Sequence, residues 1–376
     1  MDRPADVALM IHSLGGGGSE RVCLLLAEAF RDRGLSVELL LCRAEGPRMA
    51  DVPDGVNVVD FAASGSFAWG RRLAARWRRT PPRAALVFAE PAGMVALLAR
   101  RLAGARTRVV VSSRNAFSAH VARIYSPAKG AVMRRAARLL LPGADALCSV
   151  SDGVSRDLSA ALGLPRDRVR TIYNPVITAD LGARMAEPAP HPWLERPRQG
   201  SPIIVTAGRL TEQKDHAMLL RAFAQVLTAR PARLVIFGDG ELRSALEALA
   251  TDLGIAASLA MPGFTGRPHA AFARADLFVL SSAWEGLPNA LIEAMACGAP
   301  VVSTDCPSGP DEILESGALG PLVPIGDAGA LCRAILDRLA GPVDTAALRT
   351  RAQAFAIETS RDAYLDILGL TAPVET

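Results

Sequence analysis

Short apolar runs alternate with amphipathic stretches along almost the whole chain. The runs are apolar on successive residues, which is typical of strands buried on both faces of a parallel sheet. In the first half the predicted strands are Val7–Ser13, Val37–Cys42, Val56–Phe61, Ala85–Ala89, Arg108–Ser113, Ala146–Val150 and Val169–Tyr173. In the second half they are Ile203–Ala207, Arg233–Phe237, Ser258–Met261, Leu277–Ser281, Val301–Thr304 and Leu322–Pro324.

The stretches between the runs have the helical period and predict helices that cover the sheets. The clearest are Ser19–Arg33, Pro127–Leu141, His216–Thr228 and Leu242–Leu253. We therefore expect an α/β protein with two Rossmann-like domains whose parallel sheets face each other across a cleft. Residues 1–178 would form the N-terminal domain and residues 202–344 the C-terminal domain. The stretch 179–201 is rich in Pro and Ala, has no clear period and predicts a linker. The last part, 345–376, contains a helical stretch, Thr345–Leu368, that could return to the N-terminal domain.

Charge is unevenly distributed between the halves. Residues 1–180 carry 26 Lys+Arg against 16 Asp+Glu, and the remainder carries 16 against 22. The halves therefore face different partners or surfaces, or the composition simply drifts along the chain.

Composition also limits the type of protein. The N-terminus lacks the pattern of a signal peptide, and no run reaches the roughly 18 apolar residues of a membrane span. The six scattered cysteines include no Cys-x-x-Cys pair, so neither a disulfide framework nor a zinc site is indicated. Buried, reduced thiols in a cytoplasmic protein fit best.

Two carboxylates follow the apolar run Leu277–Ser281. Glu285 lies in the loop, and Glu293 lies on the second turn of the helix that begins near Pro288. We expect Pro288 at the first helical position, where a missing N–H costs nothing. Ligands bind at the carboxyl ends of strands in open α/β sheets, and a helix N-terminus attracts anions. The segment suits a site for a diphosphate and sugar hydroxyls.

Two cations lie in the loop after Ile203–Ala207. Arg209 and Lys214 are five residues apart, and Lys214 is one of only two lysines in the chain. Such a pair can straddle a diphosphate, and the alternative is a solvated pair in an ordinary loop.

Other loops after strands carry weaker signals. Gly263 and Phe264 could flank a nucleobase, although a buried ring is an equally good interpretation. The run Gly15–Gly18, followed by the potential helix cap Ser19, is a phosphate- or sugar-facing loop or a plain tight turn. In the loop Ser113–His120, His120 could orient a substrate hydroxyl or be a surface or capping histidine.

Two helical stretches are strongly basic. Lys129, Arg134, Arg135 and Arg138 share one with Val132 and Leu139, and in the other Trp69, Leu73 and Trp77 stand among five arginines. Both could lie on anionic lipid, or both could be ordinary surface helices of a Rossmann-like domain. Nucleic acid is a weaker interpretation, because no aromatic stacking surface accompanies the charge.

Together these motifs resemble the family-4 retaining glycosyltransferases of the GT-B fold. The most specific is Glu285–Glu293 within Glu-Gly-Leu-Pro-Asn-Ala-Leu-Ile-Glu, supported by Gly-Arg-Leu-x-x-x-Lys at 208–214 and Gly-Gly-Ser-Glu-Arg at 17–21. Ser113-Arg114-Asn115 and the segment 307–314 resemble transferases that act on polyprenyl-diphosphate-linked sugars.

The resemblance implies roles for individual residues. Arg209 and Lys214 would bind the donor diphosphate, Glu285 the donor sugar and Glu293 the ribose, with His120, Arg209, Lys214 and Glu285 as the catalytic set. The rest of the donor site would be Gly208, Gly263, Phe264, Gly286, Leu287, Pro288 and Asn289. The acceptor side would be Gly17, Gly18, Arg114, Asn115, Lys129, Arg134, Arg135 and Arg138. Where the family often has an Asn shortly after Gly263-Phe264, this chain has Gly266-Arg267-Pro268.

The implied activity is retaining transfer of a hexose or N-acetylhexosamine from a UDP-sugar to a polyprenyl-diphosphate-linked saccharide in cell-surface glycan assembly. We expect no cofactor and no metal, because the chain has no Asp-x-Asp motif. We also expect peripheral contact with the anionic inner face of the cytoplasmic membrane. The alternatives are a soluble acceptor, or a sugar-nucleotide-binding protein without transferase activity.

Overall fold

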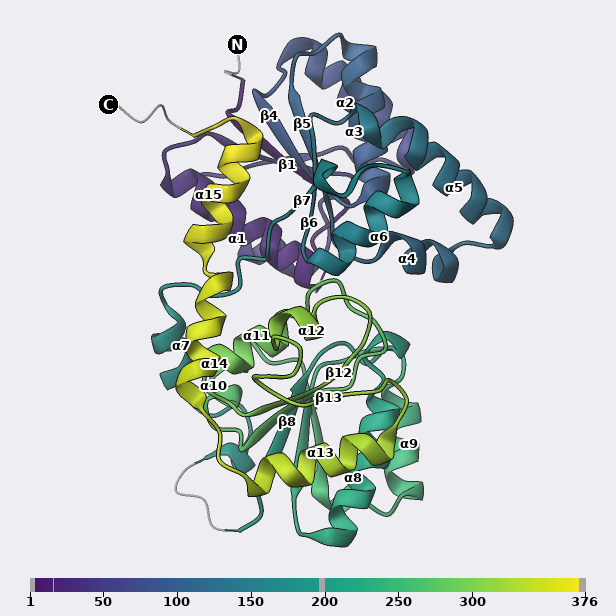
Figure 1. Ribbon diagram of the computed structural model, residues 1–376. Helices are drawn as coiled ribbons and strands as arrows, with labels where there is room; N and C mark the ends of the chain where they lie inside the picture. The colour runs from purple at the N-terminus through teal and green to yellow at the C-terminus, as the bar shows by residue number, and fades with distance from the viewer. Residues whose placement is uncertain (1–3, 16, 196–199, 372–376) are drawn as a thin grey trace. The chain divides into compact units, whose positions relative to one another are not determined.

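The structure, a computed structural model, describes residues 4–15, 17–195 and 200–371. They divide into two compact units (Figure 1). The first contains the chain up to Pro175 and again from Ile357, and the second contains Val176–Ala356. Each unit is built on its own sheet, so each is described separately.

The first unit contains a seven-stranded parallel sheet in the order β3-β2-β1-β4-β5-β6-β7. Residues Val7 to Met10 of β1 pair with β2 on one side and with β4 on the other. The strands are β1 (Val7–Ile11), β2 (Val37–Leu41), β3 (Asn57–Asp60), β4 (Ala84–Phe88), β5 (Arg108–Ser113), β6 (Ala146–Ser149) and β7 (Val169–Thr171).

Helices cover both faces of this sheet, because alternate residues of each strand point to opposite sides. Val7 and Leu9 pack with α1 and α15, which lie side by side, whereas Ala8 and Met10 face α2 and α3 (Figure 1). The helices are α1 (Gly18–Asp32), α2 (Ser66–Arg79), α3 (Glu90–Ala103), α4 (Phe117–Ile124), α5 (Pro127–Leu140), α6 (Asp152–Leu162) and α15 (Ile357–Leu368).

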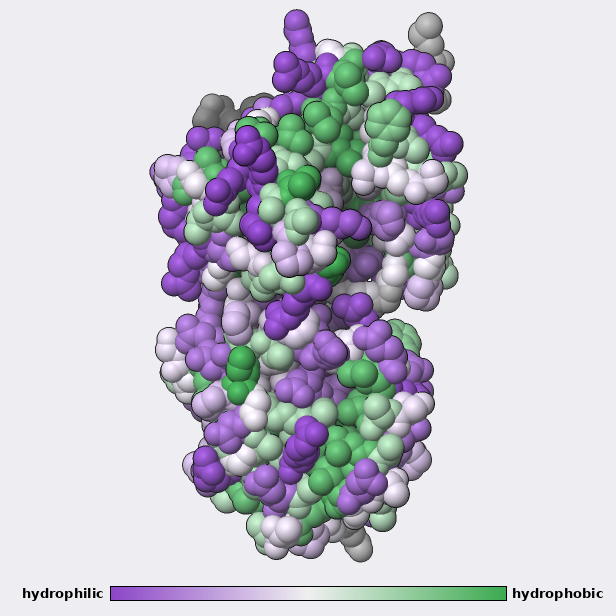
Figure 2. All heavy atoms as spheres, turned by 90° about the vertical axis from the view of Figure 1, so that its right-hand side faces the viewer, coloured by the Kyte–Doolittle hydropathy of each residue, from purple (hydrophilic) through white to green (hydrophobic). Residues whose placement is uncertain are grey.

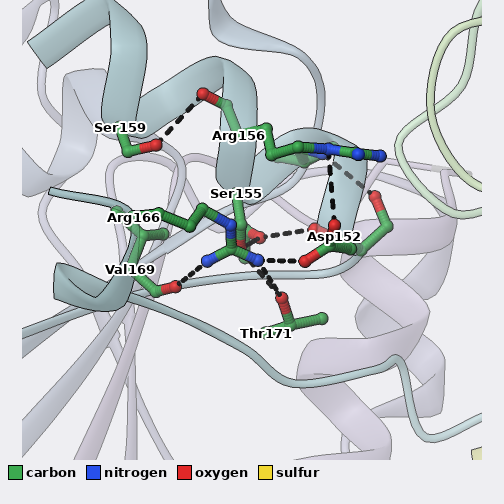
Figure 3. A network of polar contacts seen from close by, with 10 residues as sticks. Asp152, Ser155, Arg156, Ser159, Arg166, Val169 and Thr171 are labelled. Atoms are coloured by element: carbon green, nitrogen blue, oxygen red, sulfur yellow. Dashed lines mark hydrogen bonds and ion pairs between the residues drawn. The ribbon is translucent and has the colours of Figure 1, made fainter.

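Polar contacts attach the edge strand β7 to α6 (Figure 3). Arg166 donates to the carbonyl of Val169 at 2.6 Å and to Oγ1 of Thr171 at 3.2 Å, and it pairs with Asp152 at the start of α6. Ser155 contacts Thr171 at 3.0 Å. The Arg166 guanidinium therefore anchors this three-residue strand, which its pairing with β6 alone would hold weakly.

The second unit contains a six-stranded parallel sheet in the order β10-β9-β8-β11-β12-β13. The strands are β8 (Ile203–Ala207), β9 (Arg233–Phe237), β10 (Leu259–Gly263), β11 (Leu277–Leu280), β12 (Val301–Thr304) and β13 (Leu322–Val323). One face packs on α8, α9 and α13. The helices are α7 (Leu181–Ala186), α8 (His216–Ala229), α9 (Arg243–Asp252), α10 (Pro268–Phe272), α11 (Asn289–Ala296), α12 (Pro310–Ile313), α13 (Ala328–Ala340) and α14 (Thr345–Ala352). The prediction of two α/β units with parallel sheets is confirmed.

The expected linker 179–201 differs from what the structure shows. Its described part lies within the second unit and contains α7, which packs on α10. Arg274 donates to the carbonyls of Met185 at 3.1 Å and Glu187 at 2.8 Å, so tertiary contacts give this non-periodic stretch its place. Residues 196–199 of the expected linker lie outside the described residues.

The C-terminal stretch, expected as one helix over Thr345–Leu368, is broken. The segment between α14 and α15 holds buried Phe355, whose carbonyl accepts from the N–H groups of Val176 at 2.9 Å and Ile177 at 3.0 Å. Nothing in the local sequence demands a break, so this long-range pairing decides it. After the break, α15 belongs to the first unit.

The aromatic side of α2 is not available to lipid, contrary to one interpretation of the sequence. Trp69, Leu73 and Trp77 are buried in the core against α3. The four-residue spacing of these three side chains places them on the side of α2 that faces the core.

Candidate functional site

The second sheet reverses its strand order between β8 and β11. From β8 the chain moves outward to β9 and β10, and it then returns to β11 and continues to β12. The crevice at the carboxyl ends of such neighbouring strands is where open α/β sheets bind ligands. The loops after these two strands contain most of the predicted donor site. They are also linked, since Ala283 N–H donates to the carbonyl of Gln213 at 2.9 Å and Ser281 Oγ to that of Lys214 at 2.8 Å.

A buried ion pair joins the two loops at this point. Lys214 Nζ lies 2.5 Å from Glu285 Oε1, with 17 % and 7 % of the two side chains exposed. Ser282 Oγ donates to the same carboxylate oxygen at 2.7 Å, and Gln213 Nε2 lies 3.4 Å from the other. Three donors thus fix the Glu285 carboxylate before any ligand arrives. The sequence predicted Lys214 and Glu285 as separate donor-site residues. It did not predict their contact, or that Gln213 and Ser282 hold the Glu285 carboxylate.

Glycines allow the cation loop to pack closely. A Cβ on Gly208 would lie 3.2 Å from Cε of Lys214, and one on Gly238 would lie 1.9 Å from the carbonyl oxygen of Gly208. Gly238 also has φ of +144°, which disfavours other residues. The turn after β9 therefore packs against and supports the loop that carries Lys214.

Arg209 differs from Lys214 in its surroundings. Its side chain is exposed and has no hydrogen-bond or ion-pair partner within residues 4–15, 17–195 and 200–371. The site therefore has one cation neutralised by a buried carboxylate and one that remains available to an anion.

The helix after Glu285 begins one residue later than expected. Pro288 is the N-cap of α11, with φ of −75° and ψ of 94°, and not its first helical residue. Its extended ψ takes it out of the helix, and its carbonyl accepts from Leu291 N–H at 3.1 Å. Gly309, with φ of +102°, lies over this turn, because a Cβ there would be 2.6 Å from Cδ of Pro288. The predicted residues Gly286, Leu287 and Asn289 lie in this covered turn.

Glu293 is buried on the second turn of α11. Its Oε1 lies 3.6 Å from Nε2 of His269 on α10, and both side chains are almost fully buried. The sequence missed His269, because no spacing links it to Glu293.

Gly263 ends β10 with φ of +92°, and its carbonyl accepts from Gly238 N–H at 2.8 Å. Phe264 follows with 74 % of its surface exposed. The buried interpretation of this ring is therefore wrong, and an exposed ring next to the loop after β9 is open to a flat ligand.

The corresponding reversal in the first sheet lies between β1 and β4. Gly17 is the N-cap of α1 and Gly18 its first residue, so Ser19 lies inside the helix and does not cap it, contrary to expectation. The carboxylate of Glu20 lies over the loop, 2.5 Å from where a Cβ on Gly17 would be. Gly16 of the predicted loop lies outside the described residues.

Arg114 is buried and faces the interior of the first unit. Its Nη2 donates to Oδ1 of Asn174 at 2.6 Å, and its Nη1 lies 3.4 Å from the hydroxyl of Tyr364 on α15. These contacts connect the end of β5 to the C-terminal helix. The expected contact of Arg114 with an acceptor stays a prediction. Asn115 beside it is partly exposed.

A buried carboxyl group that sequence reasoning missed lies near the end of β5. Glu90 begins α3 and accepts a hydrogen bond from Ser113 Oγ. Burial raises the pKa of Glu90, which favours its neutral form. The preceding residue, Ala89, has φ of +78°, a strained conformation for alanine.

The remaining predicted residues lie on α4 and α5. His120 is on α4, not in a loop as expected, because Phe117 and Val121 pack one face of this segment into the core. Burial lowers the pKa of His120. On α5, Lys129 and Arg135 are exposed, Arg134 is half-buried, and Arg138 donates to the carbonyl of Ala161 at 2.6 Å.

Two further observations concern the described residues alone. They contain no helix long and apolar enough to span a bilayer. They also contain no group of three or more His, Cys, Asp or Glu side chains able to hold a metal ion.

His216 is a second buried histidine near the cation loop. It begins α8, its ring lies beside the backbone of Gly208 and Arg209, and neither ring nitrogen has a well-aligned hydrogen-bond partner among the described residues. Burial, and to a lesser extent the charge of Lys214, lowers the pKa of His216 to about 4. The ring is therefore neutral at physiological pH.

We expect His216 to make stability depend on pH. Because its folded pKa of about 4 lies below the ordinary 6.5, the unfolded state binds the proton first as pH falls through this window. The stabilisation that comes from this lowered pKa is fully present above pH 6.5 and is lost toward pH 4. The free energy of unfolding should therefore change by about 3 kcal/mol between these limits. In His216→Asn the unfolding free energy should fall less over this range. The Cε1–H resonance of His216 should titrate near pH 4, and titration near pH 6.5 would contradict the prediction.

Comparison with known proteins agrees with this geometry. Residues 17–175 match the family described as "Glycosyl transferase 4-like domain", and residues 201–340 match "Glycosyl transferases group 1". A Campylobacter jejuni protein named N-acetylgalactosamine-N,N'-diacetylbacillosaminyl-diphospho-undecaprenol 4-alpha-N-acetylgalactosaminyltransferase is 27 % identical over 96 % of this chain and 99 % of its own. The lipopolysaccharide core biosynthesis glycosyltransferase LpsE of Rhizobium meliloti is 36 % identical over 45 % of this chain and 50 % of its own.

Solved structures show the same fold. Anabaena HepE in complex with UDP-glucose superimposes with a TM-score of 0.79 and 20 % identity over 97 % of this chain and 99 % of that one. The lipopolysaccharide glycosyltransferase WaaG superimposes with a TM-score of 0.73 and 16 % identity over 96 % of this chain and 100 % of that one. Since the two matched domains cover most of the chain and the fold agrees throughout, the chain belongs to the family-4-like, group 1 glycosyltransferases of the GT-B fold.

Proposed function

We propose that this glycosyltransferase moves a hexose or N-acetylhexosamine from a UDP-sugar to a polyprenyl-diphosphate-linked saccharide during cell-surface glycan assembly. The observation that carries the donor half is the Lys214–Glu285 pair at the reversal of the second sheet. The name of the Campylobacter relative, which specifies a diphospho-undecaprenol acceptor, supports the acceptor half. UDP as the carrier is supported by the UDP-glucose bound to HepE.

The donor diphosphate would bind between Arg209, Lys214 and the N-terminus of α11. Lys214 has three N–H donors and uses one toward Glu285, so others can reach a phosphate oxygen. Glu285 would accept from donor-sugar hydroxyls with its second oxygen. Glu293 would bind the ribose and Phe264 the base.

Transfer would proceed with retention, the acceptor hydroxyl attacking on the face that the diphosphate leaves. Negative charge grows on the leaving diphosphate in the transition state, so cations fixed around it lower the barrier. Arg209, Lys214 and the first-turn amides of α11 supply this positive charge, and we propose that no metal ion is needed. His120 would serve the acceptor hydroxyl.

A thermal-shift screen of UDP- and GDP-sugars tests the donor half. A nucleotide-sugar at about a hundred times its Kd should stabilise the folded state by about 2.7 kcal/mol, because it binds only the native site. We expect the shift with a UDP-sugar and none with GDP-sugars. Lys214→Ala should make it smaller, whereas Arg221→Ala, which removes an exposed cation on α8, should keep it. An undiminished shift in Lys214→Ala would remove the proposed site.

Transfer to a polyprenyl-diphosphate saccharide, compared with the same saccharide lacking the lipid diphosphate, tests the acceptor half. Equal rates on both would favour a soluble acceptor. Stabilisation by a UDP-sugar without any transfer or hydrolysis would favour a binding protein.

A further inference from the structure

A buried carboxyl group at the carboxyl edge of the first sheet has no part in the proposed transfer. Glu90 follows β4, beside the reversal of strand order between β1 and β4, where open α/β sheets bind ligands. Only 5 % of Glu90 is exposed, and it forms no ion pair among the described residues, whereas the similarly buried Glu38 on β2 pairs with Arg76. A buried carboxyl group without a cation partner is either neutral or costly, and such groups gather at functional sites.

The turn before Glu90 is strained. Ala89 has φ of +78° and ψ of 150°, a region that glycine alone adopts readily. Its N–H donates to the carbonyl of Ser112 at 2.9 Å, and its carbonyl accepts from Gly93 N–H at 3.0 Å. Gly93 fits closely over β5, since a Cβ there would lie 2.6 Å from Cγ1 of Val111. Contacts with β5 and with α3 therefore hold Ala89 in a conformation that brings Glu90 to the end of β5.

One hydroxyl connects Glu90 to the loop after β5. Ser113 Oγ is in hydrogen-bond contact with Glu90 Oε1 and lies 3.2 Å from the carbonyl oxygen of Asn115. A serine hydroxyl has one proton, so it can serve only one of these two oxygens well. An ionised Glu90 can only accept, which draws the Ser113 proton away from Asn115. A neutral Glu90 has a proton of its own to donate to Ser113, and both contacts are then satisfied.

Burial decides between the two forms of Glu90. Desolvation is the largest influence on its pKa and raises it, although hydrogen bonds from Ser113 and from the Glu90 backbone N–H act in the opposite direction. Two charged groups also act on it, namely Asp157 of α6, which raises the pKa, and Arg114, which lowers it. The Arg114 guanidinium is directed toward α15 and does not pair with Glu90. The neutral acid is therefore the form that fits this position.

The loop that Ser113 holds leads to the surface. Asn115 is partly exposed, and Ala116 after it is the N-cap of α4, the helix that carries His120. Alanine has no side chain that can cap a helix, so the backbone before it must fix where α4 begins. Figure 1 places α4 on the right-hand side of the first unit, and Figure 2 shows that side with hydrophilic and hydrophobic residues intermixed. The buried contact at Ser113 is thus two residues from an accessible position.

We infer that Glu90 is a positioning residue for the saccharide acceptor: as a neutral acid it donates to Ser113, whose hydroxyl donates to the carbonyl of Asn115 and fixes the turn that leads into α4. The inference rests on the proposed function, because Asn115 and His120 are the acceptor-side groups that this turn carries. Glu90 acts through the turn and does not touch the acceptor, since it is almost fully buried. The chain of hydroxyl contacts requires an uncharged donor at position 90, which glutamine supplies and an apolar side chain does not.

Initial rates with varied polyprenyl-diphosphate saccharide at saturating UDP-sugar test this role. Glu90→Gln should keep the acceptor KM within about threefold of the wild type, because its amide N–H can donate to Ser113. Glu90→Met and Ser113→Ala should each raise the acceptor KM about tenfold, as expected for the loss of one hydrogen bond. The KM for UDP-sugar should not change in any of the three variants, which separates positioning of the acceptor from a general loss of structure.

Two measurements without substrate test the neutral form. The infrared spectrum at neutral pH should contain the C=O stretch of a neutral carboxylic acid that is absent in Glu90→Gln. Because the pKa of Glu90 is raised in the folded state, the unfolded state releases this proton first as pH rises above the ordinary 4.5, and stability falls until the folded pKa is passed. Glu90→Gln should therefore raise the unfolding temperature at neutral pH and give no such gain below pH 4.5. The matched control Glu38→Gln should lower it at neutral pH, because Arg76 loses its partner.

An acceptor KM that rises as much in Glu90→Gln as in Glu90→Met would show that the charge is needed and would overturn the inference. An unchanged acceptor KM in Ser113→Ala would equally overturn it, and this variant decides the question if Glu90→Met does not fold. Absence of the infrared band would contradict the neutral form, even in a protein that transfers no sugar. The UDP-sugar thermal shift should be unaltered in all three variants, so a failure of the inference can be told from a failure of the proposed donor site.

Discussion

Replacing Lys214 with alanine is expected to lower kcat for sugar transfer by on the order of a hundredfold or more. The Lys214 ammonium lies beside the Glu285 carboxylate at the carboxyl ends of β8 and β11, where the leaving diphosphate is proposed to lie. Its attraction is present in the bound donor and grows with the charge that the diphosphate acquires, so removal should lower kcat in addition to weakening donor binding. Initial rates at saturating UDP-sugar and acceptor give this value.

The control for this variant is Arg221→Ala, which removes an exposed cation from the same unit. It should leave kcat within about twofold of the wild type, because exposed charges away from the site contribute little. Loss of Lys214 also leaves Glu285 as an uncompensated buried carboxylate, so thermal unfolding must show that the variant is folded at the assay temperature. Unchanged kcat in a folded Lys214→Ala would exclude the assigned role.

The second large effect concerns the ion pair as a unit. Glu285→Gln keeps the size of the side chain but removes the charge that holds Lys214, so it should also lower transfer on the order of a hundredfold. The double variant Lys214→Ala/Glu285→Gln should lose no more than about tenfold beyond the worse single variant, because both substitutions disrupt the same arrangement.

The wild type, the two single variants and the double variant form a double-mutant cycle, and their kcat/KM values should be compared under identical conditions. Multiplicative losses, reaching about ten thousandfold in the double variant, would show that the two side chains act independently. Ser282→Ala removes one donor to the same carboxylate at 2.7 Å and should give a smaller loss, because two donors remain.

The parallel sheets and their loops could be predicted because the signals are local. A run such as Ile203–Ala207 is apolar on both faces, and that alone requires cover on both sides of a sheet. The reversal of strand order then brings together whatever follows the central strands. The family resemblance assigned the motifs after Ile203–Ala207 and Leu277–Ser281 to one donor site, and the strand order of the structure explains why the two loops are neighbours.

Helix placement was less predictable where burial decides it. The spacing of Trp69, Leu73 and Trp77 is the same for a core-facing side and for a lipid-facing side, and only packing against α3 distinguishes the two. Exposed Val132 and Leu139 on α5 show the opposite outcome in another basic helix. His120 was expected in a loop, and only the packing of Phe117 and Val121 into the core shows that it lies on the short helix α4.

The amino-acid sequence by itself determined the alternation of strands and helices, the separation into two parallel sheets, and the loops that carry Arg209, Lys214 and Glu285. These depend on periodicity and on residue types within a few positions of one another. Only the tertiary structure decided that Lys214 pairs with a carboxylate 71 residues away, and that Arg114 faces Tyr364, 250 residues away. It also decided that Phe355 interrupts the C-terminal helix. Such contacts depend on which distant side chains the fold brings together and which of them it buries. Neither can be predicted from residues that are close in the sequence.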